Sequence, residues 1–131
     1  MHITKDNIDE FIKGTTMDCY NNEITYIEYI PEPITHFDCS NNNLTKLPKL
    51  PDGLIRLDCY NNQLTNLPKL PESLIRLDCQ NNKLTELPIL HESLEYLVCI
   101  FNNLPYEITI DNYKEHNKLI KRKEILKLIC T

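Results

Sequence analysis

Cysteine is the residue type here best suited to chemistry, and five cysteines recur at intervals of 20 residues: Cys19, Cys39, Cys59, Cys79 and Cys99. A thiolate can attack an electrophile or bind zinc, and two thiols can form a disulfide. An interval of 20 residues is not a zinc-site spacing, in which paired ligands lie a few residues apart. We expect no nucleophile beside His36, His91 or His116, because the five cysteines are expected to point into a core.

Each cysteine lies within the same short sequence pattern, which indicates a repeat. One copy contains Leu54, Leu57, Cys59, Asn62 and Leu64, and the next contains Leu74, Leu77, Cys79, Asn82 and Leu84. Three further copies occupy residues 14–24, 34–44 and 94–104. A unit this short cannot bury its own apolar face, so the copies must stack. The sequence therefore predicts an α/β solenoid with about five short parallel strands.

The pattern L-x-x-L-x-C-x-x-N-x-L resembles the leucine-rich repeat, with Cys at its third apolar position, over residues 14–104. The first copy departs from it at Gly14. The connecting half, residues 47–51, has prolines three apart, which favours extended, polyproline-like backbone on the convex side. Such short repeats are similar to those of secreted bacterial effectors and some large DNA viruses. The effectors often carry a ubiquitin-ligase domain, but its Cys-x-Asp motif is missing from this sequence.

Strand alternation assigns a position to each repeated residue. The fourth and sixth residues of each copy point inward, so the five cysteines are expected to be reduced and buried. The sixth cysteine, Cys130, is the one expected to react. The ninth residue lies where the chain leaves the sheet, and its amide can satisfy the backbone groups of the turn. We interpret this column as an asparagine ladder: Asn22, Asn42, Asn62, Asn82 and Asn102.

We treat residues 1–131 as one domain with a helical cap at each end of the stack. Residues 1–13 form the first cap, with a helix over 5–13 whose apolar side is Ile8, Phe11 and Ile12. Residues 105–131 form the second cap, with a helix over 111–129. Its apolar stripe is Leu119, Ile120, Leu126 and Ile129, and its basic residues are Lys118, Lys121, Arg122, Lys123 and Lys127.

The outward-pointing strand residues form the concave face, where solenoids bind partners. Its middle column is Asp18, Asp38, Asp58, Asp78 and Val98. This column is a surface of paired and solvated charge, a product of repeat duplication without purpose, or a groove for a basic or mixed-charge protein segment. In each case we expect that it is not there for stability. Copy five turns apolar, either to contact the cap or to form a binding patch. The candidate partner-binding residues are His36, Asp38, Arg56, Asp58, Tyr60, Arg76, Asp78, Tyr96, Ile100 and Phe101.

Composition narrows the function classes. The net charge is −5, with −7 on residues 1–104 and +2 on residues 105–131, which argues against nucleic acid as the ligand. A chain with two glycines has no phosphate-binding loop, and parallel carboxylates do not encircle a calcium ion. We therefore expect no cofactor, no metal and no catalysis. The sequence has no signal-like start and no apolar run of about 18 residues.

These observations predict a non-enzymatic module that binds a protein partner through its concave face. Because the five repeat cysteines are interpreted as buried core and not as disulfides, we expect a reducing compartment. This would be the cytoplasm, or the host cytoplasm if the source is a pathogen. Two alternatives stay open. One is a structural protein that assembles with itself, and the other is a peripheral membrane adaptor that uses the basic helix, although the sequence favours a protein partner over a membrane.

Overall fold

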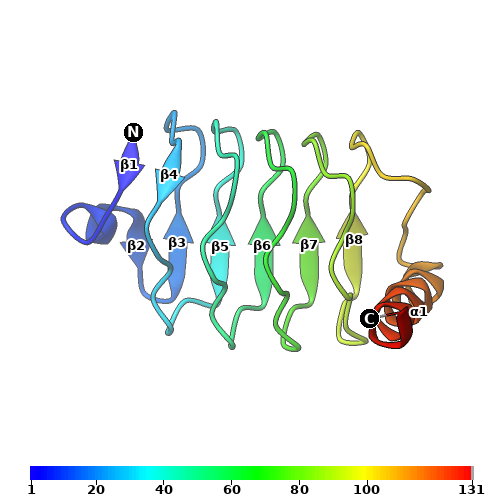
Figure 1. Ribbon diagram of the computed structural model, residues 1–131. Helices are drawn as coiled ribbons and strands as arrows, with labels where there is room; N and C mark the ends of the chain where they lie inside the picture. Colours follow the sequence, from blue (N-terminus) through cyan, green and yellow to red (C-terminus); the bar gives the residue numbers. More distant parts are fainter. Residues whose placement is uncertain (131) are drawn as a thin grey trace.

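The computed structural model describes residues 1–130, with side chains as far as Ile129, and its centre is a row of parallel strands (Figure 1). The strands are β3 (Thr16–Asp18), β5 (His36–Asp38), β6 (Arg56–Asp58), β7 (Arg76–Asp78) and β8 (Tyr96–Val98). Neighbours pair at an offset of 20 residues, so that Phe37 lies opposite Leu57 and Leu57 opposite Leu77. The predicted solenoid of about five parallel strands is confirmed. The Cys130 side chain lies outside the description.

The core runs through the stack as columns of identical side chains. The inward strand residues are fully buried in copies three and four, where Leu57 and Leu77 alternate with Cys59 and Cys79. All five repeat cysteines are buried and unbridged. In copies two to four, the proline-containing segments that return across the convex side form neither helix nor strand. Proline removes a backbone donor, which explains why these segments stay extended.

The asparagine ladder is confirmed, and Asn62 shows its geometry. Its side-chain oxygen accepts a hydrogen bond from the Leu44 amide at 3.0 Å. Its amide nitrogen donates to the carbonyl oxygens of Cys39 at 3.0 Å and Cys59 at 3.2 Å. The ladder residues of copies two to five therefore each join their own coil to the preceding one. Asn22 has no preceding coil, and its exposed side chain donates to the Tyr20 carbonyl oxygen at 2.9 Å.

The N-terminal cap differs from the prediction, because the helix over 5–13 is a single 3-10 turn, η1 (Ile8–Phe11). The chain continues into β2 (Ile12–Lys13), which pairs antiparallel with β3 and covers the sheet edge that the first coil would expose. Gly14, at φ +62°, makes the tight turn between them instead of ending a helix. β1 (His2–Ile3) pairs with β4 (Tyr26–Ile27) on the opposite side of the coil.

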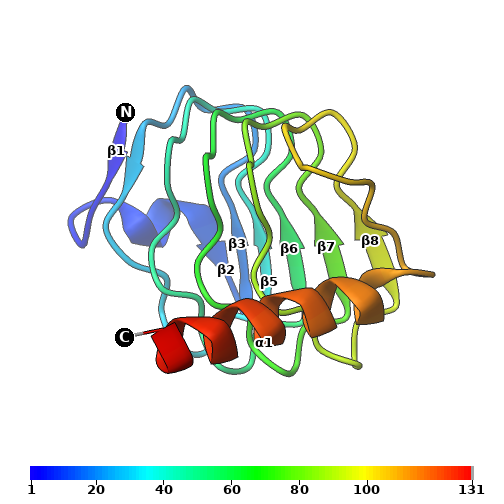
Figure 2. The same cartoon turned by 45° about the vertical axis from the view of Figure 1, so that its right-hand side comes forward.

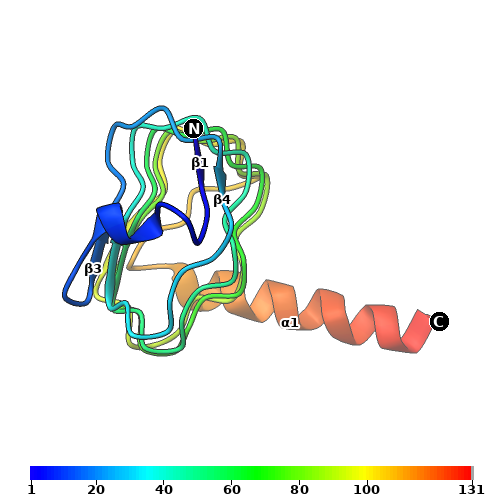
Figure 3. The ribbon, with the colours of Figure 1, turned by 90° about the vertical axis from the view of Figure 1, so that its left-hand side faces the viewer.

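The C-terminal helix α1 (Tyr113–Cys130) begins two residues later than predicted, and only its first turns pack on the coils. Tyr113 and His116 are buried, and Asn117 bonds both the amide and the carbonyl of Leu90. From Lys121 to Ile129 every side chain is exposed. Of the predicted apolar stripe only Ile120 is partly buried, because the helix leaves the stack on the side opposite the strands (Figures 2 and 3).

Candidate functional site

The aspartates of the concave face form one column in register, since Asp38 pairs with both Asp18 and Asp58, and Asp58 with Asp78. Three of these carboxylates accept a hydrogen bond from the backbone amide two residues further on. The distances are 3.1 Å for Asp18, 2.9 Å for Asp38 and 3.4 Å for Asp78. Such bonds fix the turn that follows each strand. The prediction that the column has no role in stability is therefore incomplete.

One interpretation of the column required solvated carboxylates, but Asp58 and Asp78 are buried. Asp58 is 1 % exposed and lies between two arginines, with Oδ2 2.5 Å from Arg56 Nε and Oδ1 3.0 Å from Arg76 Nε. Arg76 reaches Asp78 at 3.9 Å and lies 4.0 Å above the ring of Tyr96. We call Arg56, Asp58, Arg76 and Asp78 the arginine–aspartate network. A partner would meet the guanidinium groups of this network rather than the carboxylate of Asp58.

The network also raises the pKa of its central arginine, Arg76. Burial lowers the pKa of Arg76, but the hydrogen bond from its guanidinium to Asp58, the charge of Asp58, and smaller contributions from Tyr96 and Asp78 outweigh burial and raise it. Partial burial raises the pKa of Tyr60, and the charges of Asp38 and Asp58 and the neighbouring Tyr20 raise it further. Both side chains therefore keep their protons, and the middle of the face presents fixed positive charge and hydroxyl donors.

Asp18 and Asp38 differ from the rest of the column, because neither forms an ion pair with a residue among 1–130. We call these two residues the acidic end. They line a hollow of about 210 Å³ together with Thr16, His36, Phe37 and Arg56. Burial raises the pKa of Asp38, and repulsion from Asp58 and Asp18 adds to this, against the opposing hydrogen bonds of Ser40.

We predict that Asp38→Asn leaves the protein equally stable or stabilises it at neutral pH, by less than about 1 kcal/mol. An Asn oxygen can still accept the Ser40 amide, while the repulsion is removed. The sign follows from the raised folded-state pKa, since the proton binds more tightly in the folded state and stability falls as pH rises through that pKa. Urea unfolding at pH values on both sides of the carboxyl pKa measures the change, and a loss well above this size would contradict it.

One of the two interpretations required the copy-five side chains to be buried under the C-terminal cap, but they are not. Tyr96 is 41 % exposed, Ile100 56 % and Phe101 70 %, so all three remain accessible. The C-terminal segment closes the core with Ile108 and Tyr113 and leaves these three side chains uncovered. We call Tyr96, Ile100 and Phe101 the apolar end of the concave face.

Phe101 also has an unusual backbone, at φ +59° in the left-handed region. The equivalent residues of the other copies have φ of 55–56°, and all four are asparagine: Asn21, Asn41, Asn61 and Asn81. Asparagine adopts this conformation far more readily than a bulky residue does. The recurring first asparagine of each Asn-Asn pair is a sequence signal of positive φ, distinct from the ladder role of the second. Phe101 therefore keeps a strained backbone while exposing a large ring.

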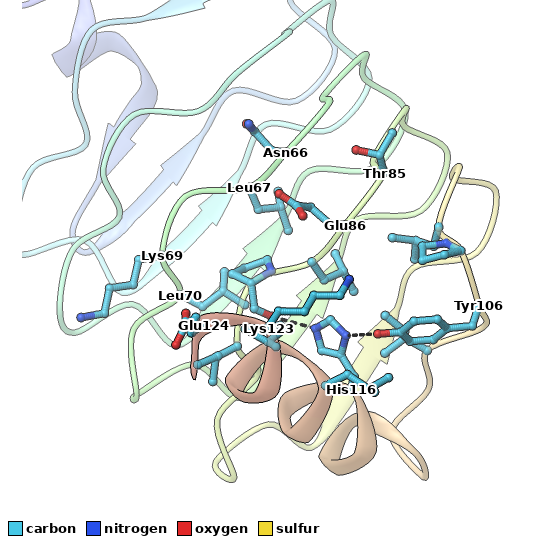
Figure 4. Close-up of a pocket in the computed structure, with 18 of the residues that line it drawn as sticks. Asn66, Leu67, Lys69, Leu70, Thr85, Glu86, Tyr106, His116, Lys123 and Glu124 are labelled. Carbon is cyan, nitrogen blue, oxygen red and sulfur yellow. Dashed lines mark hydrogen bonds between the residues drawn. The ribbon is translucent and has the colours of Figure 1, made fainter. Parts of the chain in front are cut away.

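A second hollow, of about 620 Å³, lies between α1 and the convex side, and the sequence did not predict it (Figure 4). Its walls are largely apolar, with Leu67 and Leu87 among them. His116 bonds the Tyr106 hydroxyl at 2.9 Å and the Pro88 carbonyl at 3.2 Å, which holds the base of α1. In the described part of the chain, no group of three His, Cys, Asp or Glu side chains could hold a metal. No described helix is long and apolar enough to cross a membrane.

Stacked 20-residue coils with inward leucines and an asparagine ladder define the leucine-rich repeat, and this chain belongs to that family. Its structure is similar to that of YopM from Yersinia enterocolitica WA-314, with a TM-score of 0.63 and 32 % identity over 72 % of this chain. The match covers 21 % of the YopM chain, so this chain spans about a fifth of that protein's length. No family model and no curated protein matches the sequence. The fold is typically a scaffold for protein interaction.

Proposed function

We propose that this chain is a non-enzymatic module that binds a protein partner through its concave face. The observation that carries the proposal is the apolar end, where three large side chains are exposed together beside the ordered arginine–aspartate network. An aromatic centre with a polar surround is the usual composition of an interaction hot spot. The buried free thiols suit a reducing compartment such as a cytoplasm.

Site-specific photo-crosslinking tests this proposal. A photoreactive residue in place of Gln80 on the concave face should give crosslinked products with a partner polypeptide in lysates of candidate host cells. The matched control is the same residue in place of Lys49, which is exposed on a proline-containing connecting segment. Equal crosslinking from both positions would contradict binding through the concave face, and mass spectrometry of the product separates a foreign protein from a second copy of this chain.

We predict that Phe101→Asn stabilises the protein by about 1 kcal/mol, because asparagine relieves the strain of a left-handed backbone. The same change should weaken partner binding, since it removes the most exposed ring of the apolar end. Chemical unfolding and the crosslinking yield from position 80 measure the two effects. Tyr96→Ala is the companion variant, and it should reduce crosslinking without a gain in stability. A Phe101→Asn variant that loses stability would show that the ring packs in the folded state.

A further inference from the structure

We propose that the concave face receives helix α1 of a second copy of this chain, with the lysines of the helix over the acidic end and its apolar tip over the apolar end. This inference rests on the proposed function and names the partner of the same face. The first observation is the direction of α1, which leaves the stack on the side opposite the strands, so a chain cannot place its helix on its own concave face (Figure 3).

The outer side of α1 carries the complementary groups. Residues three or four apart lie on one side of a helix. Tyr113, His116 and Ile120 face the coils. The side turned away presents lysines and then apolar residues, all exposed: Lys114, Lys118, Lys121, Ile125 and Ile129. An outer side that begins basic and ends apolar matches a face that is acidic at one end and apolar at the other.

The lengths of the two surfaces also agree. From Lys118 to Ile129 an α-helix rises about 16–17 Å. On the concave face, three strand intervals separate β5 from β8 and four separate β3 from β8, which is about 14–19 Å. A helix lying across the strands can therefore put a lysine at Asp18 or Asp38 while Ile125 and Ile129 reach Tyr96 and Phe101.

Charge favours a second copy over an anionic membrane as the occupant. Residues 113–131 have six basic and two acidic side chains, a net charge of +4, whereas residues 1–112 have eight basic and 17 acidic ones, a net charge of −9. An anionic lipid surface would attract the helix but repel the rest of the chain. The body of a second copy attracts the helix, and Asp18 and Asp38 have no cationic partner among the described residues.

Charge reversal in the full-length chain tests the inference by sedimentation velocity at low salt over a concentration series. The helix variant is Lys114→Glu, Lys118→Glu and Lys121→Glu, and the face variant is Asp18→Lys and Asp38→Lys. Each variant alone should associate about tenfold or more weakly than the wild type, because like charges then meet. An equimolar mixture should recover association, since the reversed helix matches the reversed face. The matched control, Lys5→Glu, Lys46→Glu and Lys49→Glu, has the same charge change at exposed sites elsewhere and should keep wild-type association.

Three outcomes would overturn the inference: a wild-type chain that is monomeric at every concentration, association that both variants retain, or a monomer that binds anionic vesicles through the same lysines. If the face variant fails to fold, Asp18→Asn with Asp38→Asn keeps the turn hydrogen bonds and removes the charge. A monomeric chain whose position 80 still crosslinks to a foreign protein would leave the proposed function standing and reject this partner alone.

Discussion

Raising the pH from about 8 to about 10 should unfold this protein cooperatively, because the five buried thiols cannot ionise in place. Burial, with smaller contributions from nearby carboxylates, raises the pKa of Cys19 to about 12. Burial raises the pKa of Cys99 to about 11, against the lowering effect of a backbone hydrogen bond of Ile108. The pKa values of Cys39, Cys59 and Cys79 lie well above the ordinary value of 9.0, also chiefly through burial.

The direction of the effect follows from proton binding. Below pH 9 the thiols keep their protons in both states, so their contribution to stability is fully present. Above it the unfolded chain ionises while the folded chain does not, and stability falls as pH rises. One unit above the unfolded pKa, each thiol costs about 1.4 kcal/mol, so five cost about 7 kcal/mol, which is comparable to the whole stability of many domains.

Urea unfolding in reducing buffer at a series of pH values measures this loss. The background should be Cys130→Ser, so that the titration reports the five repeat cysteines. Cys79→Ala is the control, because a chain with four buried thiols should lose stability less steeply with pH even if it starts less stable. Unchanged stability between pH 8 and 10 would mean that the thiols ionise without unfolding, against their burial.

Replacing Asn62 by Ala should cost roughly 3 kcal/mol, because it leaves the buried Leu44 amide without its acceptor and removes three further hydrogen bonds to backbone carbonyls. The carbonyls of Cys39 and Cys59 each lose one of two side-chain donors and keep the other, from Asn42 and Asn82. These groups lie inside the stack, where water cannot replace the lost bonds. The damage also spans two coils, so it should weaken the interface between copies two and three.

Asn22→Ala is the matched control for this substitution. Asn22 occupies the same repeat position, but its side chain is exposed and donates to a single carbonyl, so the expected loss is below about 1 kcal/mol. Equilibrium unfolding of the two variants under identical conditions gives the comparison. Equal losses would show that the repeat position matters through backbone conformation and not through the ladder of hydrogen bonds.

The sequence predicted the parts of the fold that repetition enforces. Equal spacing places Leu57 beside Leu77 and Asn62 beside Asn82, so strand register, core and ladder follow from one copy. The two ends have no repeat to constrain them. The turn at Gly14 and the path of α1 depend on single contacts, such as the bonds of Asn117 to Leu90. The cross-strand pairing of Asp58 with Arg76 was likewise hidden, because the sequence did not predict how side chains on adjacent strands would cross.

The fixed offset of 20 residues has a consequence for how such a protein can change over generations. Each coil contacts only its neighbours, and residues 54–64 and 74–84 are nearly identical, so recombination within the gene can delete or duplicate one coil in frame. The remaining coils keep neighbours of the same kind and the stack stays closed at both ends. Each such event would move Phe101 nearer to or further from Asp38 by one strand interval, about 4.8 Å. Gain and loss of whole coils can therefore alter the length of surface that a partner must span without any substitution in the core.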